Sequence, residues 1–103
     1  MKTTPARMNA RDKDCTLSFP GCTNDTSTVV LCHLRMFNGG GMGFKPHDSE
    51  AVFACHDCHA KLDGREQVKN MYLSELWEAI AWALVKTIRI QREDGILKFK
   101  GEK

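Results

Sequence analysis

Two pairs of cysteines constrain the fold of this 103-residue chain more than any other feature. Cys55 and Cys58 form a Cys-x-x-Cys pair, which turns tightly enough to place both sulfurs on one metal ion, and tetrahedral zinc is the usual occupant. Cys15 and Cys22 form a second pair, and the Phe-Pro-Gly turn between them would fold the second thiol back toward the first. Together the two pairs predict a structural zinc site with four cysteine ligands.

The cysteine count and the start of the chain favour zinc over disulfides. The chain has five cysteines, an odd number, and it starts with no apolar stretch that resembles a signal peptide. We therefore expect a cytoplasmic protein, because cysteines in a reducing compartment bind metal more often than they pair. The alternative is a secreted domain held by disulfides. The longest apolar run, residues 79–85, is too short to span a membrane.

The residues after the Cys-x-x-Cys pair predict a second polar face. His59 follows the second cysteine directly, and Asp63 lies four residues later, so both fall on one face of the expected helix. One short element would then carry the structural zinc on one side and His59 with Asp63 on the other.

The middle of the chain predicts a small α+β core. Residues 28–34 are β-branched and apolar and predict a strand, and residues 51–54 predict a second one that leads into Cys55. The glycine-rich stretch 36–43 between them predicts a loop. The helix that follows the second strand should end at Gly64, a favourable residue just past a helix end.

The C-terminal third predicts one long amphipathic helix. Apolar residues recur at three-and-four spacing over residues 73–88, about five turns, and residues 96–100 alternate as in a short terminal strand that could pair with the helix end. A second apolar stripe, Ala79, Trp82 and Ala83, predicts a homodimer through this helix. The alternative is that the N-terminal arm or the terminal strand covers the stripe.

These elements predict one domain over residues 1–103. It would consist of a loose basic arm at 1–14, a zinc-stapled core at 15–65, and the helix and strand at 70–103. The arm would be either disordered or in contact with phosphates. The formal net charge of +2 is too small to indicate nucleic-acid binding by itself.

The order of these elements resembles the HNH nucleases, whose ββα-metal core pairs a hairpin with a helix around one catalytic metal. More narrowly, it resembles the small HNH nucleases of prophages and lambdoid phages. The shared segments are Ala-Arg ahead of Cys15, Pro-Gly before Cys22, Thr-x-Val-Leu-x-His ending at His33, and Ala-Cys-x-x-Cys-His ending at His59. The resemblance covers roughly residues 10–65. It implies a metal-dependent DNA endonuclease with a treble-clef-like, zinc-stapled core.

The resemblance also assigns roles. The four cysteines match structural zinc ligands, His33 matches the general base that takes a proton from the attacking water, and His59 matches a ligand of the catalytic ion. That ion would be magnesium or another divalent cation, which neutralises charge on the phosphate and the leaving oxygen. Arg35, two residues past His33, is placed to hold a phosphate oxygen. Imidazole suits the base because its pKa lies near neutrality.

The sequence departs from the family pattern at two positions. Cys32 stands where many HNH enzymes have an aspartate or histidine ligand, and the family's central asparagine has no clear match. We expect Cys32 to be a buried thiol of the strand, and Asp48 and Asp63 to complete the ligands of the ion.

Two other functions stay open from the sequence. One is a zinc module that binds DNA or a protein without cutting, and the other is a structural partner in phage recombination or packaging. His33 distinguishes an enzyme from these alternatives, because an enzyme needs this histidine unligated and facing a groove. A binding module could bury it or use it as a zinc ligand.

Overall fold

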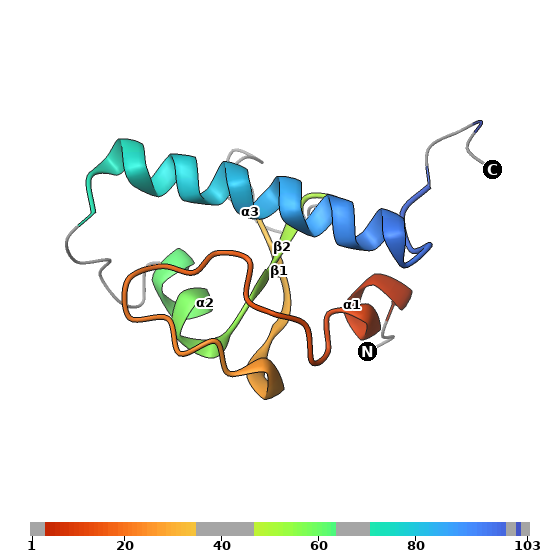
Figure 1. Cartoon of the computed structure of the whole chain (residues 1–103), viewed down its shortest axis with the longest axis horizontal. Coiled ribbons are helices and arrows are strands. Elements are labelled where there is room, and N and C mark those ends of the chain that lie inside the picture. Colours follow the sequence, from red (N-terminus) through yellow and green to blue (C-terminus); the bar gives the residue numbers. More distant parts are fainter. Residues whose placement is uncertain (1–3, 35–46, 64–70, 99–100, 102–103) are drawn as a thin grey trace.

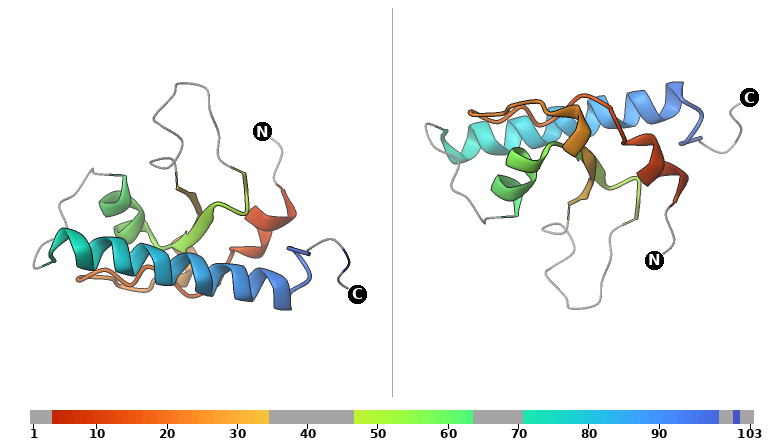
Figure 2. Two further views of the ribbon diagram at one scale, coloured as in Figure 1. Left: turned by 90° about the horizontal axis from the view of Figure 1, so that it is seen from above. Right: turned by 90° about the horizontal axis from the view of Figure 1, so that it is seen from below.

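The computed structural model describes residues 4–34, 47–63, 71–98 and 101, and the structural statements below refer to these residues. In Figures 1 and 2, α1 and α2 lie toward opposite ends of the long helix α3, with the two strands between them. The elements, in chain order, are α1 (Pro5–Asn9), a 3-10 turn η1 (Thr26–Thr28), β1 (Val30–His33), β2 (Ala51–Ala54), α2 (His56–Leu62) and α3 (Leu73–Glu93).

The N-terminal arm is a short helix packed on the core, so the loose arm predicted from its polar sequence is wrong for the described part. Thr4 caps α1, because its Oγ1 accepts a hydrogen bond from the Arg7 N–H at 3.2 Å. Pro5 opens the helix, where its missing N–H costs nothing. Ala6 and Ala10 are buried, and their small size lets α1 approach β1 closely.

The two strands form the antiparallel hairpin that the sequence predicted. Val30 lies opposite Ala54, and His33 lies opposite Ala51. All four residues of β2 are buried. β1 is shorter than expected at its start because the 3-10 turn occupies the preceding residues. Gly64, where the sequence placed the end of α2, lies outside the described residues, and α2 ends at Leu62.

The outer edge of β2 bonds to side-chain hydroxyls instead of a third strand. The Phe53 N–H lies 3.2 Å from Thr16 Oγ1 and 3.2 Å from Thr87 Oγ1, and the Phe53 carbonyl accepts from the Thr16 N–H at 2.8 Å. The two hydroxyls lie 3.0 Å apart and share a hydrogen bond. Two threonines thus satisfy a buried strand edge that would otherwise leave backbone groups unpaired.

The long helix forms where the sequence predicted it, but neither predicted apolar stripe matches its buried face: Leu73 and Trp77 of the first stripe are exposed. Its buried residues are Ile80, Ala83, Thr87 and Gln91, which share one face. Ala83 is therefore a core residue, and of the second stripe only Trp82 is largely exposed. None of the described helices has the length and apolar character that crossing a membrane requires.

The terminal strand predicted for residues 96–100 does not form over its described part, 96–98. Gly95 has a φ of +73°, and its N–H donates to the Arg92 carbonyl at 3.1 Å. The Ile96 N–H donates back to the Gln91 carbonyl at 2.8 Å. This Schellman arrangement ends α3 and turns the chain back over the last helical turn. The residues expected to pair with the strand therefore stay helical.

The hydroxyl pair at the edge of β2 gives a test of the fold. We expect Thr87→Val to lower the free energy of unfolding by about 1–2 kcal/mol, because an isosteric methyl cannot accept from the Phe53 N–H. Thr87→Ser keeps the hydroxyl and should lose less than Thr87→Val. Urea denaturation of both variants measures the difference, and a Val variant as stable as the parent would contradict this account.

Candidate active site

The two cysteine pairs meet at one point of the structure. The sulfurs of Cys15, Cys22, Cys55 and Cys58 all lie within 4.8 Å of one another. The 3.6 Å between the sulfurs of Cys22 and Cys55 is far beyond the roughly 2.05 Å of a disulfide. Three of the four are buried, and Cys22 is partly exposed. A closed set of four sulfurs is the arrangement of a structural zinc site.

A tight turn returns the second cysteine to the first. Gly21 has a φ of +86°, and the Cys22 N–H donates to the Phe19 carbonyl at 2.8 Å. Lys61 of α2 donates its Nζ to the Pro20 carbonyl at 2.7 Å. A Cβ on Gly21 would lie 2.9 Å from that Nζ, so glycine serves both the backbone angle and the close approach.

The charges of the sulfurs fit a bound cation. The hydrogen bond with the Cys58 thiol lowers the pKa of Cys15 to about 4, which favours its thiolate form. Desolvation raises the pKa of Cys22 to about 11, and the hydrogen bond with Cys15, together with burial, raises that of Cys58. A divalent cation bound here would favour the ionised form of the sulfurs that hold it.

A second cluster combines one residue of β1, one residue of α2 and the residue that directly follows α2. The possible ligand atoms of Cys32, His59 and Asp63 all lie within 4.8 Å of one another. His59 Nε2 is 3.1 Å from Asp63 Oδ2, as their four-residue spacing predicted. Cys32 is buried, but the other two side chains are 33% and 42% exposed. The cluster could therefore hold a metal that is reachable from solvent.

Cys32 was expected to be a buried thiol of the strand and not a member of this cluster. The signal was its position directly before His33, where HNH enzymes place a ligand. The cysteine is buried as expected. The side of the strand on which it is buried is the side that faces α2, so its sulfur lies near His59 and Asp63.

His33 lies outside both clusters and pairs with Asp48. Its Nε2 is 2.7 Å from Asp48 Oδ1, and the two side chains are 11% and 26% exposed. Burial raises the pKa of the Asp48 carboxyl, but hydrogen bonds from His33 and Thr4 outweigh burial and hold it below its usual value. Asp48 therefore stays ionised beside the imidazole. It is not a member of the second cluster, where the sequence analysis expected it.

A groove opens at His33. It has a volume of about 330 Å³, and Arg7 and Arg11 of the N-terminal segment line it together with β1 residues and His33. Phosphate contacts by this arm were one of two alternatives left open by the sequence, which did not place them beside His33. Arg35, its candidate for a phosphate contact, lies outside the described residues.

Comparison with known proteins points to one family. The family model described as "Putative nuclease YbcO" matches residues 4–96. Two relatives carry the same description, one from Escherichia coli (strain K12) and one from Enterobacteria phage 82. Each is 31% identical over 93 residues, which cover 89% of this chain and 95% of the relative.

A solved structure is also similar. It is described as "Structure of a putative bacteriophage protein from Escherichia coli str. K-12 substr. MG1655". The TM-score is 0.69 at 27% sequence identity, and the match covers 88% of this chain and all of that one.

The four-sulfur cluster predicts a fold that depends on metal. We expect the purified protein to contain zinc, and strong chelation to unfold it cooperatively, because such sites contribute roughly 10–16 kcal/mol in zinc-finger peptides. Cys58→Ser should lose both zinc and structure. His56→Ala is the matched control, since this exposed residue of α2 belongs to neither cluster and should retain zinc. Elemental analysis and circular dichroism measure both, and folded protein free of zinc would overturn this assignment.

Proposed function

The chain belongs to the family described as "Putative nuclease YbcO", and we propose that it is a metal-dependent DNA endonuclease of the HNH type. One observation carries the proposal. The His33–Asp48 pair lies at a groove lined by two arginines, and the residue before His33 belongs to a cluster suited to metal.

The pair sets up His33 as the general base. When its Nε2–H donates to the Asp48 carboxylate, the lone pair lies on Nδ1, which can take a proton from the attacking water. The carboxylate then stabilises the imidazolium that forms. Asp48 in this proposal orients the base instead of binding the ion.

The second cluster would hold the catalytic ion. Cys32, His59 and Asp63 offer a thiol, an imidazole and a carboxylate. A divalent ion bound there would supply Lewis-acid stabilisation of the charge on the phosphate and the leaving oxygen. The thiol and imidazole favour zinc over magnesium or manganese, which prefer oxygen ligands.

The substrate would lie across the end of β1. Cys32 and His33 are consecutive residues at the end of β1, so the ligand of the ion and the base would be held at the same end of one strand, on its two faces. Arg7 and Arg11 are four residues apart, and their guanidinium groups suit phosphate oxygens. They take the role that the sequence analysis gave to Arg35.

The position of His33 favours an enzyme over a zinc module that only binds. A binding module could use this histidine as a zinc ligand or bury it. Here it belongs to neither cluster of possible ligands and lines a groove.

Plasmid cleavage with manganese, magnesium or zinc tests the mechanism. We expect His33→Ala to slow cleavage by about 10²–10⁴-fold while the protein still folds, because the water loses its base. His56→Ala is the matched control, since this exposed histidine of α2 has no role in the proposal. Absence of cleavage by the parent under all three ions, or unchanged cleavage by His33→Ala, would leave the zinc-module alternative.

We also propose that a second copy of the chain packs on α3. The helix face opposite the core carries Trp82, which is 54% exposed, and Val85, which is 40% exposed. Glu78 and Lys86 flank Trp82 at four residues on either side, and both are exposed. An antiparallel copy crossing at Trp82 would therefore place each Glu78 against Lys86 of the other copy.

The same symmetry holds one turn further out. Glu75 and Arg89 are exposed and lie seven residues on either side of Trp82. Opposite charges at matched distances from an apolar centre are self-complementary, which is what a two-fold interface requires.

Charge exchange tests this interface. We expect Glu78→Lys to weaken the dimer, because it places two lysines opposite each other, and the double variant Glu78→Lys, Lys86→Glu to restore it. Sedimentation equilibrium over a micromolar range measures the three proteins. A monomeric parent, or a double variant no tighter than the single one, contradicts the antiparallel pairing.

A further inference from the structure

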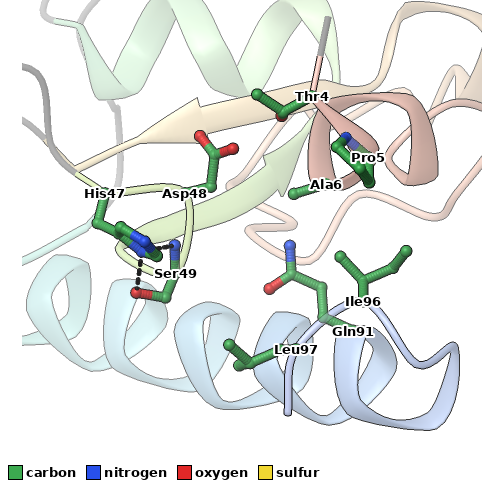
Figure 3. Close-up of a pocket in the computed structure, with 9 residues that line it drawn as sticks. All are labelled: Thr4, Pro5, Ala6, His47, Asp48, Ser49, Gln91, Ile96 and Leu97. Carbon is green, nitrogen blue, oxygen red and sulfur yellow. Dashed lines mark hydrogen bonds between the residues drawn. The ribbon is translucent and has the colours of Figure 1, made fainter.

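A cavity of about 210 Å³ lies between the start of α1, the residues before β2 and the end of α3 (Figure 3). Its polar groups include Asp48, Ser49 and Gln91, and Ile96 and Leu97 are among its apolar walls. It is smaller than the roughly 300–1,000 Å³ of pockets that take whole drug-sized ligands. A single ring system is therefore a suitable occupant.

Gln91 is the unusual residue of this cavity. Its side chain is almost fully buried, and its Nε2 has no hydrogen-bond partner among the described residues. Figure 3 shows the amide nitrogen pointing into the cavity. Buried donors are rarely left unpaired, so this N–H indicates a ligand that offers an acceptor.

The backbone holds Gln91 firmly in this position. The N–H groups of Ile96 and Leu97 both donate to its carbonyl, at 2.8 and 3.1 Å. Thr87, one turn earlier on the same face, satisfies the buried edge of β2 with its hydroxyl. The Gln91 amide, one turn after Thr87, is therefore positioned by the same packing, but it faces the cavity.

The charges of the cavity select the kind of ligand. Among the described residues that line it, His47 and Asp48 are the titratable ones and none is a lysine or arginine; the Asp48 carboxylate disfavours an anion such as phosphate. A fitting ligand is neutral, with an acceptor for Gln91 and a donor for the oxygens of Asp48 or Ser49. Nucleobases present such donors and acceptors on the edge of a flat ring, and glutamine and aspartate are among the side chains that read them.

We propose that this cavity binds an unpaired nucleobase next to the phosphodiester and that Gln91 determines which base is preferred. The proposal rests on the nuclease function given above. Asp48 lines this cavity and bonds to His33, which lines the arginine groove, so the two hollows lie on either side of one His–Asp pair. A phosphate in the groove would place its own base near the cavity. That base must leave the stack, so unpaired or distorted DNA is the expected substrate.

Binding without cleavage tests this assignment. Fluorescence anisotropy, with no added divalent ion, compares the parent on short single-stranded oligonucleotides of dA, dC or dT. We expect a preference of about tenfold for one base, the discrimination typical of a specific contact. Gln91→Leu should bind all three within about twofold of one another and keep the overall affinity, since phosphate contacts set the position.

Two further measurements separate a ligand contact from a structural role. Gln91→Leu removes an unpaired buried N–H, so its melting temperature should rise, whereas loss of a structural hydrogen bond would lower it. Leu97→Trp fills the cavity while keeping Gln91, and should also abolish the preference.

The outcomes also separate this inference from the nuclease proposal. Equal binding of all oligonucleotides by the parent, no binding, or a preference that survives in Gln91→Leu would overturn the base-binding cavity, whatever plasmid cleavage shows. A base preference lost in Gln91→Leu would support it even if the parent cuts no plasmid.

Discussion

The meeting of four sulfurs fixes more of this structure than any other contact. It joins the loop after α1 to the start of α2, two segments that are far apart in the chain. Because Cys55 directly follows β2 and Cys58 lies in the first turn of α2, the same junction fixes the direction in which the helix leaves the sheet. His59 and Asp63 then face Cys32 as a consequence. A small core can hold a polar cluster in place when a metal-binding junction supplies the rigidity.

Two consecutive residues of strand β1 have different surroundings. Side chains alternate along a strand, and the alternation here separates Cys32, which meets α2, from His33, which meets the arginines of the N-terminal segment. In the proposed mechanism the ion and the base therefore depend on consecutive residues of one strand, and each has its own environment. The thiol lies in a buried, metal-binding setting, and the imidazole lies beside a carboxylate and a groove.

The sequence predicted the features that depend on local patterns and failed on those that depend on distant contacts. The cysteine spacing, the Ala51–Ala54 strand and the long helix α3 were readable because neighbouring residues encode them, but which face of α3 is buried was not. Helix α1 was missed because five residues are too few for a periodicity, and its buried alanines matter only when β1 is present. The His33–Asp48 pair joins residues on either side of the glycine-rich stretch, and no local sequence pattern predicts such a contact.

The buried polar residues of α3 show how one helix face can serve both fold and function. Thr87 completes the edge of a strand, so its burial is explained by the fold. Gln91 is equally buried one turn later, but the fold gives its amide nitrogen no partner among the described residues, and an apolar residue of similar size would fit the packing with less cost. A chain that retains such a donor carries a local loss of stability. That loss is understandable where the donor faces a cavity that shares a wall with the proposed base, because the missing partner is then supplied by the substrate.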